Sequence, residues 1–246
     1  MAIGTRSYAR GYLSNSGLPP GVKWLLVANC AVFLVQFLTF GKLDGLFAYL
    51  ALVPIAVVKG FFLWQLVTYM FLHVGILHLV FNMLALWMFG RELEQTWGTD
   101  RFLRFYFLCG VLAGVCVVIA NFIFGSPQAA TVGASGAIYG VLAASAALWP
   151  DRIILFSFLF PIKMKWFVLI IGAIAFFNSR NMNSGVSDIA HLTGLIFGYV
   201  LAKLPRGSRM RLGASLQQAY KDWKLQRAKK KFQVYLRKQG RGPWVN

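Results

Sequence analysis

Charged side chains are scarce in this sequence. Only 13% of the 246 residues are Asp, Glu, Lys or Arg, whereas 58% are hydrophobic, and the mean hydropathy is +0.62. Soluble domains carry about a quarter charged residues, so this chain cannot cover a water-exposed surface of its own size. The shortage excludes a soluble globular enzyme and an intrinsically disordered chain, and it favours the lipid bilayer as the solvent.

Cysteine and acidic residues are scarce as well. The three cysteines lie in apolar segments at no metal-ligand spacing, and their odd number excludes a disulfide scaffold. Seven Asp and Glu oppose 25 Lys and Arg, which gives a net charge of +18, and 13 of these cations follow residue 202. We therefore expect a basic tail that lies against anionic lipid headgroups. Nucleic acid is the alternative partner for the tail and is not expected.

The sequence is rich in apolar segments. A membrane-spanning helix needs about 20 apolar residues, so a chain of this length holds about six or seven. We predict an all-α, polytopic membrane protein whose six transmembrane helices form a bundle at residues 24–40, 71–89, 101–122, 133–149, 166–177 and 188–204. Residues 1–23 are then a leader, 24–204 the membrane domain and 205–246 the tail. The first span is predicted to be a retained helix rather than a cleaved signal peptide.

Two segments within the membrane domain are too short or too interrupted to span. Residues 41–70 contain Gly, Pro and charges, and we expect an interfacial loop with short helices. Residues 152–165 are predicted to form a short interfacial or re-entrant piece. The loop at 41–70 and the polar connection at 178–187 are candidates for controlling access to a site.

The distribution of Lys and Arg predicts the orientation. With six spans, the leader, the loop that contains Arg91, the 152–165 segment and the tail fall on one side, and the opposite side carries only Lys42, Lys59 and Arg180. The positive-inside rule then places both termini in the cytoplasm. We expect a multi-pass protein of a bacterial plasma membrane, whose second, fourth and sixth spans begin at the outer surface.

Those three spans carry polar residues near their outer ends. His78 and Asn82 are four residues apart and share one helix face, Ser135 opens the fourth span, and His191 lies in the first turn of the sixth. Polar side chains are costly in a bilayer and indicate function by default. A serine hydroxyl is a weak nucleophile until an imidazole takes its proton, so we expect Ser135 and His191 to form a catalytic pair.

An acyl-transfer reaction also needs donors for its oxyanion. Asn82, the backbone N–H of Ser135 and His78 are candidates. The rival use of the histidines is metal binding, but His73 and His78 are five apart, about 140° around a helix, and lack the acidic partner of a zinc protease. No metal or other cofactor is therefore expected. A small transporter would need midplane polar groups and internal repeats, and the sequence shows neither.

Asp188 has two interpretations. It lies three residues before His191 and could orient the imidazole as the third member of a triad. The preferred interpretation is a helix N-cap formed by Ser187 and Asp188, which leaves a Ser-His dyad.

Together these residues resemble the rhomboid family of intramembrane serine proteases. The resemblance rests on His78-x-x-x-Asn82, then Gly133-Ala134-Ser135-Gly136, then Ala190-His191-Leu192-Thr193-Gly194, and it covers about residues 24–204. It implies a rhomboid-like bundle in which Ser135 is the nucleophile, His191 is the general base, and His78 and Asn82 line the oxyanion site.

The resemblance also implies supporting residues. Tyr139 would pack against the catalytic imidazole, or else take part only in ordinary helix packing. Gly133 and Gly136 flank the nucleophile, and the strip of Gly194 and Gly198 would let the sixth span approach the fourth closely.

The implied activity is endopeptidase cleavage of transmembrane protein substrates within or near the outer leaflet. The alternative is a catalytically inactive rhomboid-like protein that binds client transmembrane helices.

Overall fold

The computed structural model describes residues 17–39, 42–156, 160–179, 185–204 and 222–228, with the backbone alone at 185–187. Most of the leader, residues 180–184 of the polar connection and most of the basic tail lie outside these residues. The chain divides into two units, Met1–Lys203 and Leu204–Asn246. In the second unit, residues 222–228 form a short helix in which the Arg227 guanidinium lies 5.2 Å from the Trp223 ring centroid.

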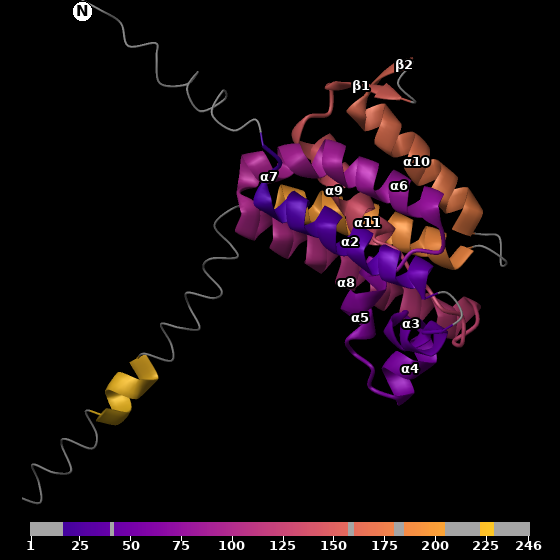
Figure 1. Cartoon of the computed structure of the whole chain (residues 1–246). Helices are drawn as coiled ribbons and strands as arrows, with labels where there is room; N and C mark the ends of the chain where they lie inside the picture. The colour runs from indigo at the N-terminus through magenta and orange to yellow at the C-terminus, as the bar shows by residue number, and fades with distance from the viewer. Residues whose placement is uncertain (1–16, 40–41, 157–159, 180–184, 205–221, 229–246) are drawn as a thin grey trace, which may run out of the picture. The chain divides into compact units, whose positions relative to one another are not determined.

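The first unit is a bundle of apolar helices (Figure 1). Its long elements are α2 (Pro20–Leu38), α6 (Ile76–Ala85) with its continuation η2 (Leu86–Gly90) and α7 (Arg91–Trp97), α8 (Thr99–Phe124), α9 (Ser135–Leu148), α10 (Met164–Ser179) and α11 (Gly185–Lys203). The predicted interfacial loop contains α3 (Asp44–Leu50), α4 (Pro54–Lys59), α5 (Gln65–Thr68) and η1 (Tyr69–Phe71). These short helices and the hairpin of β1 (Ile153–Phe156) and β2 (Phe160–Lys163) lie on opposite sides of the bundle (Figure 1).

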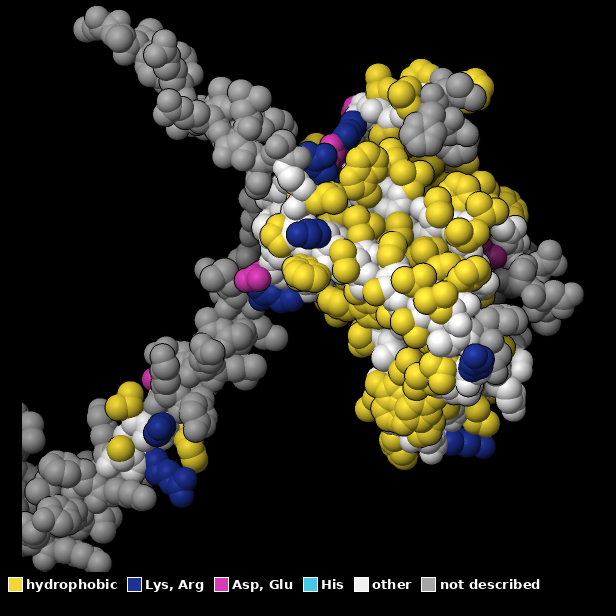
Figure 2. Space-filling view, in the orientation of Figure 1, with side chains coloured by type: hydrophobic (Ala, Val, Ile, Leu, Met, Phe, Trp, Pro, Cys, Tyr) yellow, Lys and Arg dark blue, Asp and Glu magenta, His cyan; other side chains and the backbone are white. Residues whose placement is uncertain are grey.

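The outer surface of the bundle is apolar. Figure 2 shows hydrophobic side chains over most of the visible face, and large apolar residues on α2, α6, α8 and α10 are exposed. Three helices are each long and apolar enough to cross a membrane within the described residues: α2, Ile76–Trp97 and α8. These features confirm the predicted helical, polytopic membrane bundle, whereas the count of six spans stays a prediction.

The second span differs from the prediction at both ends. It begins at Ile76 rather than 71, because Leu72 is extended and Gly75, also extended, precedes the first helical residue. It also continues past the predicted stop, through a π-helical turn and α7, to Gly98, whose positive φ of 80° ends it. Gly90 is helical and its missing Cβ makes room, since a Cβ would lie 3.0 Å from Leu86.

Most of residues 152–165 form an antiparallel hairpin, which the sequence pattern did not indicate, whereas their placement as an interfacial or re-entrant piece stays a prediction. Ile153 pairs with Lys163 and Ile154 pairs with Ile162 in its register, and β-branched residues favour such strands. Just before the hairpin, the exposed carboxylate of Asp151 accepts hydrogen bonds from two lysines, at 2.8 Å from Lys165 and 3.3 Å from Lys163. These hydrogen bonds lower the pKa of Asp151 below its ordinary value.

Helix α9 lies in the middle of the bundle and contacts α8, α10 and α11. Most of its residues are buried, and most of these are Gly or Ala. Small residues let neighbouring backbones approach closely in a membrane protein. Helix α9 is therefore held on several sides, which fixes the position of its first residue, Ser135.

A buried carboxylate joins the beginning of α2 to α7. Glu94 is 2% exposed and accepts hydrogen bonds from the backbone N–H groups of Gly21 (2.8 Å) and Val22 (2.7 Å) and from the hydroxyl of Thr99 (2.6 Å). The first N–H groups of a helix have no partner inside it. Glu94 satisfies two of them and places its negative charge at the positive end of the α2 dipole.

Candidate active site

The structure brings Ser135 and His191 together from two different helices. Ser135 is the first residue of α9, and His191 lies on α11. The Ser135 Oγ and His191 Nε2 atoms are 2.8 Å apart, and both residues are partly buried. This is the separation that proton transfer from a hydroxyl to an imidazole requires.

Close packing of α9 against α11 sets this separation. A Cβ on Gly194 would overlap the carbonyl oxygen of Gly136, and a Cβ on Gly198 would overlap the carbonyl oxygen of Gly140. The two helices therefore touch backbone to backbone over a full turn. Only glycine at these positions of α11 permits that approach.

The ring of His191 has contacts on its face and on its far edge. Tyr139, one turn after Ser135 on α9, stacks on the imidazole with centroids 4.3 Å apart and an angle of 8° between the planes. The Nδ1 atom of His191 lies 3.4 Å from Asp188 Oδ1. Because α11 begins at Gly185, Asp188 lies inside the helix rather than at its N-cap.

His78 and Gly133 border the space in front of Ser135. Gly133 has a positive φ of 127°, and its N–H donates to the carbonyl of Tyr69 at 2.9 Å. A Cβ on Gly133 would lie 2.8 Å from the His78 ring and 3.8 Å from Ser135 Oγ. The absent side chain thus leaves room between the imidazole of His78 and the hydroxyl.

Asn82 lies one turn after His78 on α6 and is 6% exposed. Its Nδ2 donates to the carbonyl of His78 at 2.9 Å. A side-chain amide has two N–H donors, so this bond uses one and leaves the other for a ligand. His73, the remaining histidine of the chain, lies in the segment before α6, and its ring packs edge-on against His78 with centroids 5.1 Å apart.

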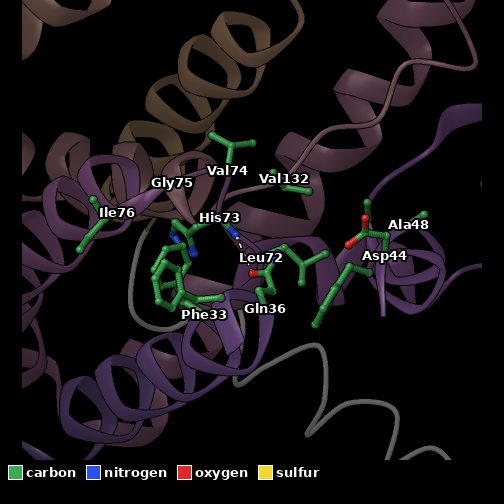
Figure 3. A pocket seen from close by; sticks show the side chains of 13 residues that line it. Phe33, Gln36, Asp44, Ala48, Leu72, His73, Val74, Gly75, Ile76 and Val132 are labelled. Carbon is green, nitrogen blue, oxygen red and sulfur yellow. Dashed lines mark hydrogen bonds between the residues drawn. The ribbon is translucent and has the colours of Figure 1, made fainter. Parts of the chain in front are cut away.

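A mainly apolar cavity of about 760 Å³ lies beside this group (Figure 3). Its wall includes residues of α2, α3 and the segment before α6, together with Val132, the neighbour of Gly133. The backbone N–H of His73 donates to Gln36 Oε1 at 3.2 Å, the hydrogen bond drawn in Figure 3. Neither ring nitrogen of His73 has a hydrogen-bond partner among the described residues.

This cavity is not among the features that the sequence pattern predicts. Gln36 was the available signal, because a side-chain amide in a largely apolar helix is costly in a bilayer unless it has a role. As for metal binding, no three His, Cys, Asp or Glu side chains come together as a ligand set within the described part of the chain.

Comparisons with known proteins identify the family to which this chain is similar. Residues 61–206, more than half of the chain, match the Rhomboid domain. The chain is 40% identical over 139 residues to the rhomboid protease GluP of Bacillus subtilis, covering 56% of this chain and 25% of GluP. It is 32% identical over 145 residues to the putative rhomboid protease YdcA of the same organism, covering 57% and 66%.

A third relative matches along nearly its whole length. The rhomboid protease GlpG of Haemophilus influenzae is 27% identical over 205 residues, which cover 81% of this chain and 98% of GlpG. By contrast, the chain spans less than two thirds of the length of GluP and of YdcA. With its helical membrane bundle and the match over residues 61–206, the chain belongs to the rhomboid family.

Proposed function

We propose that this integral membrane protein is a serine endopeptidase that cleaves transmembrane proteins within or near the outer leaflet. Ser135 is the nucleophile and His191 the general base of a dyad. The observation that carries the proposal is the 2.8 Å separation of Ser135 Oγ and His191 Nε2 across two packed helices. The relatives named rhomboid proteases support the same activity.

The reaction follows from these contacts. His191 Nε2 takes the proton of Ser135 as its oxygen attacks the scissile carbonyl, and the imidazolium then gives the proton to the leaving amine. Water, activated by the same imidazole, then hydrolyses the acyl-enzyme. Ser135 is the first residue of α9, so its backbone N–H is one of the four that find no acceptor inside the helix.

Three donors are assigned to the oxyanion: the backbone N–H of Ser135, the ring of His78 and the side-chain amide of Asn82. The His78 carbonyl accepts from one of the two N–H groups of that amide, and the other is left for the oxyanion. Loss of one such donor commonly costs about 2.7–4 kcal/mol of transition-state stabilisation. The open position of Gly133 is the space in which the oxyanion forms, because it lies close to both His78 and Ser135 Oγ.

The substrate is a membrane-spanning segment that unwinds locally. A helix hides its peptide carbonyls in its own hydrogen bonds. Only a segment with weak helical propensity therefore exposes a carbonyl at a low cost in free energy. The apolar cavity beside His78 then receives a side chain of the unwound segment. Its lining residues Phe33, Phe47 and Leu72 favour an apolar side chain.

The topology belongs to the proposal too. Residues 24–204 form the protease domain with six spans, both termini are cytoplasmic, and the membrane is a bacterial plasma membrane. The leader of residues 1–23 and the basic tail of residues 205–246 lie on the cytoplasmic side, the tail against anionic lipid.

The test is cleavage of reporter transmembrane segments in proteoliposomes, with product masses determined. We expect wild type to cleave and to react at Ser135 with a fluorophosphonate. Ser135→Ala should fold and insert normally yet do neither. Ser145→Ala is the matched control, because Ser145 on the same helix only donates to the carbonyl of Val141. Cleavage by Ser135→Ala would remove the assignment, and an inert wild type that still binds client helices would establish the non-catalytic alternative.

A further inference from the structure

The contact between Asp188 and His191 has no role in a two-residue mechanism. Asp188 Oδ1 lies 3.4 Å from His191 Nδ1, whereas His191 Nε2 faces Ser135 Oγ at 2.8 Å. The two contacts lie on opposite edges of the imidazole. The side chain of Asp188 is 15% exposed and that of His191 is 19% exposed, so water screens this pair only in part.

Helix capping does not account for Asp188. An N-cap side chain accepts hydrogen bonds from the N–H groups two or three residues later. Helix α11 begins at Gly185, so Asp188 is the fourth helical residue, and its side chain lies one turn before His191 on the same face. The predicted N-cap at Ser187 and Asp188 is therefore wrong, because the helix begins at Gly185.

The other groups around His191 restrain its ring but do not select its tautomer. Tyr139 of α9 stacks on the face of the imidazole and makes no in-plane contact. His78 of α6 is the other titratable side chain whose charge acts on His191. Asp188 is the described anionic group at the Nδ1 edge.

We propose that Asp188 is a positioning residue that acts through His191. Its carboxylate accepts the Nδ1–H of the imidazole and so keeps the lone pair on Nε2, directed at the hydroxyl of Ser135. When the proton of Ser135 moves to Nε2, the ionised carboxylate stabilises the imidazolium and does not itself become protonated. The proton then leaves with the amine of the product. This inference rests on the proposed serine protease activity.

The size of the effect follows from the geometry. Where a buried Asp makes a short hydrogen bond to the base, its change to Asn lowers kcat about 10⁴-fold. Here the contact is longer and partly exposed, so we expect Asp188→Asn to lower kcat by about 10- to 100-fold. KM should change little, because Asp188 is separated from the substrate by the imidazole. Asp188→Glu should restore part of the rate.

The experiment measures kcat, KM and thermal unfolding of purified full-length variants with one reporter transmembrane segment. Asp100→Asn is the matched control, since Asp100 lies at the start of α8 with its side chain 91% exposed and pairs only loosely with Arg104. It should cleave like wild type. A second arm adds Asp188→Asn to His191→Ala, where it should cause no further loss of residual cleavage.

The outcomes separate the two proposals. A fall in kcat at constant KM, partial rescue by Glu and no effect in the His191→Ala background support the positioning role. The inference is overturned by an unchanged kcat in Asp188→Asn, by an effect confined to KM, or by a loss of activity that follows a lower unfolding temperature in Asn and Glu variants alike. Inactive wild type with unlabelled Ser135 would instead remove the proposed function, and this inference with it.

Discussion

Gly194 of α11 lies directly against the backbone carbonyl of Gly136 on α9, with no room for even a methyl group between them. This contact is one residue from Ser135 and three from His191 along the chain. The separation of the two reactive atoms therefore depends on a packing contact that involves neither of them.

The first prediction follows from that contact. Gly194→Ala should push α11 away from α9 and lower the free energy of unfolding by about 1–3 kcal/mol. It should also reduce the cleavage rate by more than the fraction of protein that unfolds. Gly45→Ala is the control, because a Cβ there meets nothing within 4 Å. Thermal unfolding in detergent and reporter cleavage check both variants, and a fully active Gly194→Ala would contradict the role of the close approach.

The second prediction concerns the space in front of Ser135. Gly133→Ala should reduce cleavage by about 100-fold, comparable to loss of an oxyanion donor, because the new methyl group meets His78. Gly98→Ala separates this effect from backbone strain. Gly98 also has a positive φ, but a Cβ there has open space, so this variant should lose stability and keep its activity. Equal activities in the two variants at equal stability would argue against the assignment.

The third prediction concerns the buried carboxylate of Glu94, which accepts hydrogen bonds from the beginning of α2. Glu94→Gln replaces one acceptor oxygen with an NH₂ group that faces an N–H, and should cost about 1–3 kcal/mol of stability. Glu92→Gln makes the same change two residues earlier in a partly exposed ion pair with Arg152, worth about 0–1 kcal/mol. Unfolding measurements on both variants check the difference, and equal losses would show that the buried hydrogen bonds of Glu94 do not matter.

The fourth prediction is a pH dependence at the base of the β1–β2 hairpin. The pKa of Asp151 is lowered because Lys165 and Lys163 donate hydrogen bonds to it. The stabilising contribution is therefore complete above the unfolded-state pKa, about 3.9, and is lost as the pH falls through the lower folded-state value. Lys165→Met should raise the pKa of Asp151 toward its ordinary value. Carboxyl ¹³C shifts in nanodiscs measure it, and an unmoved midpoint would refute the pairing.

Much of the bundle could be predicted from apolar length. The apolar run predicts a spanning helix at residues 101–122, and helix α8 covers Thr99–Phe124, because a lipid-facing helix must be apolar along its whole length. The pairing of Ser135 with His191 was predictable for a related reason. Polar residues are so rare in these spans that two at one predicted depth are expected to meet, although their catalytic roles stay a proposal.

The details that failed depend on contacts between distant residues. Leu72 and Val74 continue the apolar pattern of the helix that follows, so composition could not place the start of α6. That segment is instead held by the hydrogen bond from the His73 N–H to Gln36, 37 residues away. The residue type of Asp188 predicts a cap, whereas α11 begins at Gly185 and includes Asp188 as its fourth residue.

The π-helical turn at Leu86–Gly90 joins α6 to α7 and changes the direction in which the side chains of α7 point relative to those of α6. In an unbroken α-helix, Asn82 and Glu94 would point about 120° apart, since 12 residues advance by 100° each. One additional residue accommodated in a wide turn reduces that difference to about 20°. Both side chains are buried, at 6% and 2% exposure. A single helix can therefore direct an amide inward at one end and a carboxylate inward at the other. Deleting one residue from the turn would restore a regular α-helix in which the two side chains, then 11 residues apart, still differ by about 20°, so the extra residue is accommodated without turning either of them toward lipid.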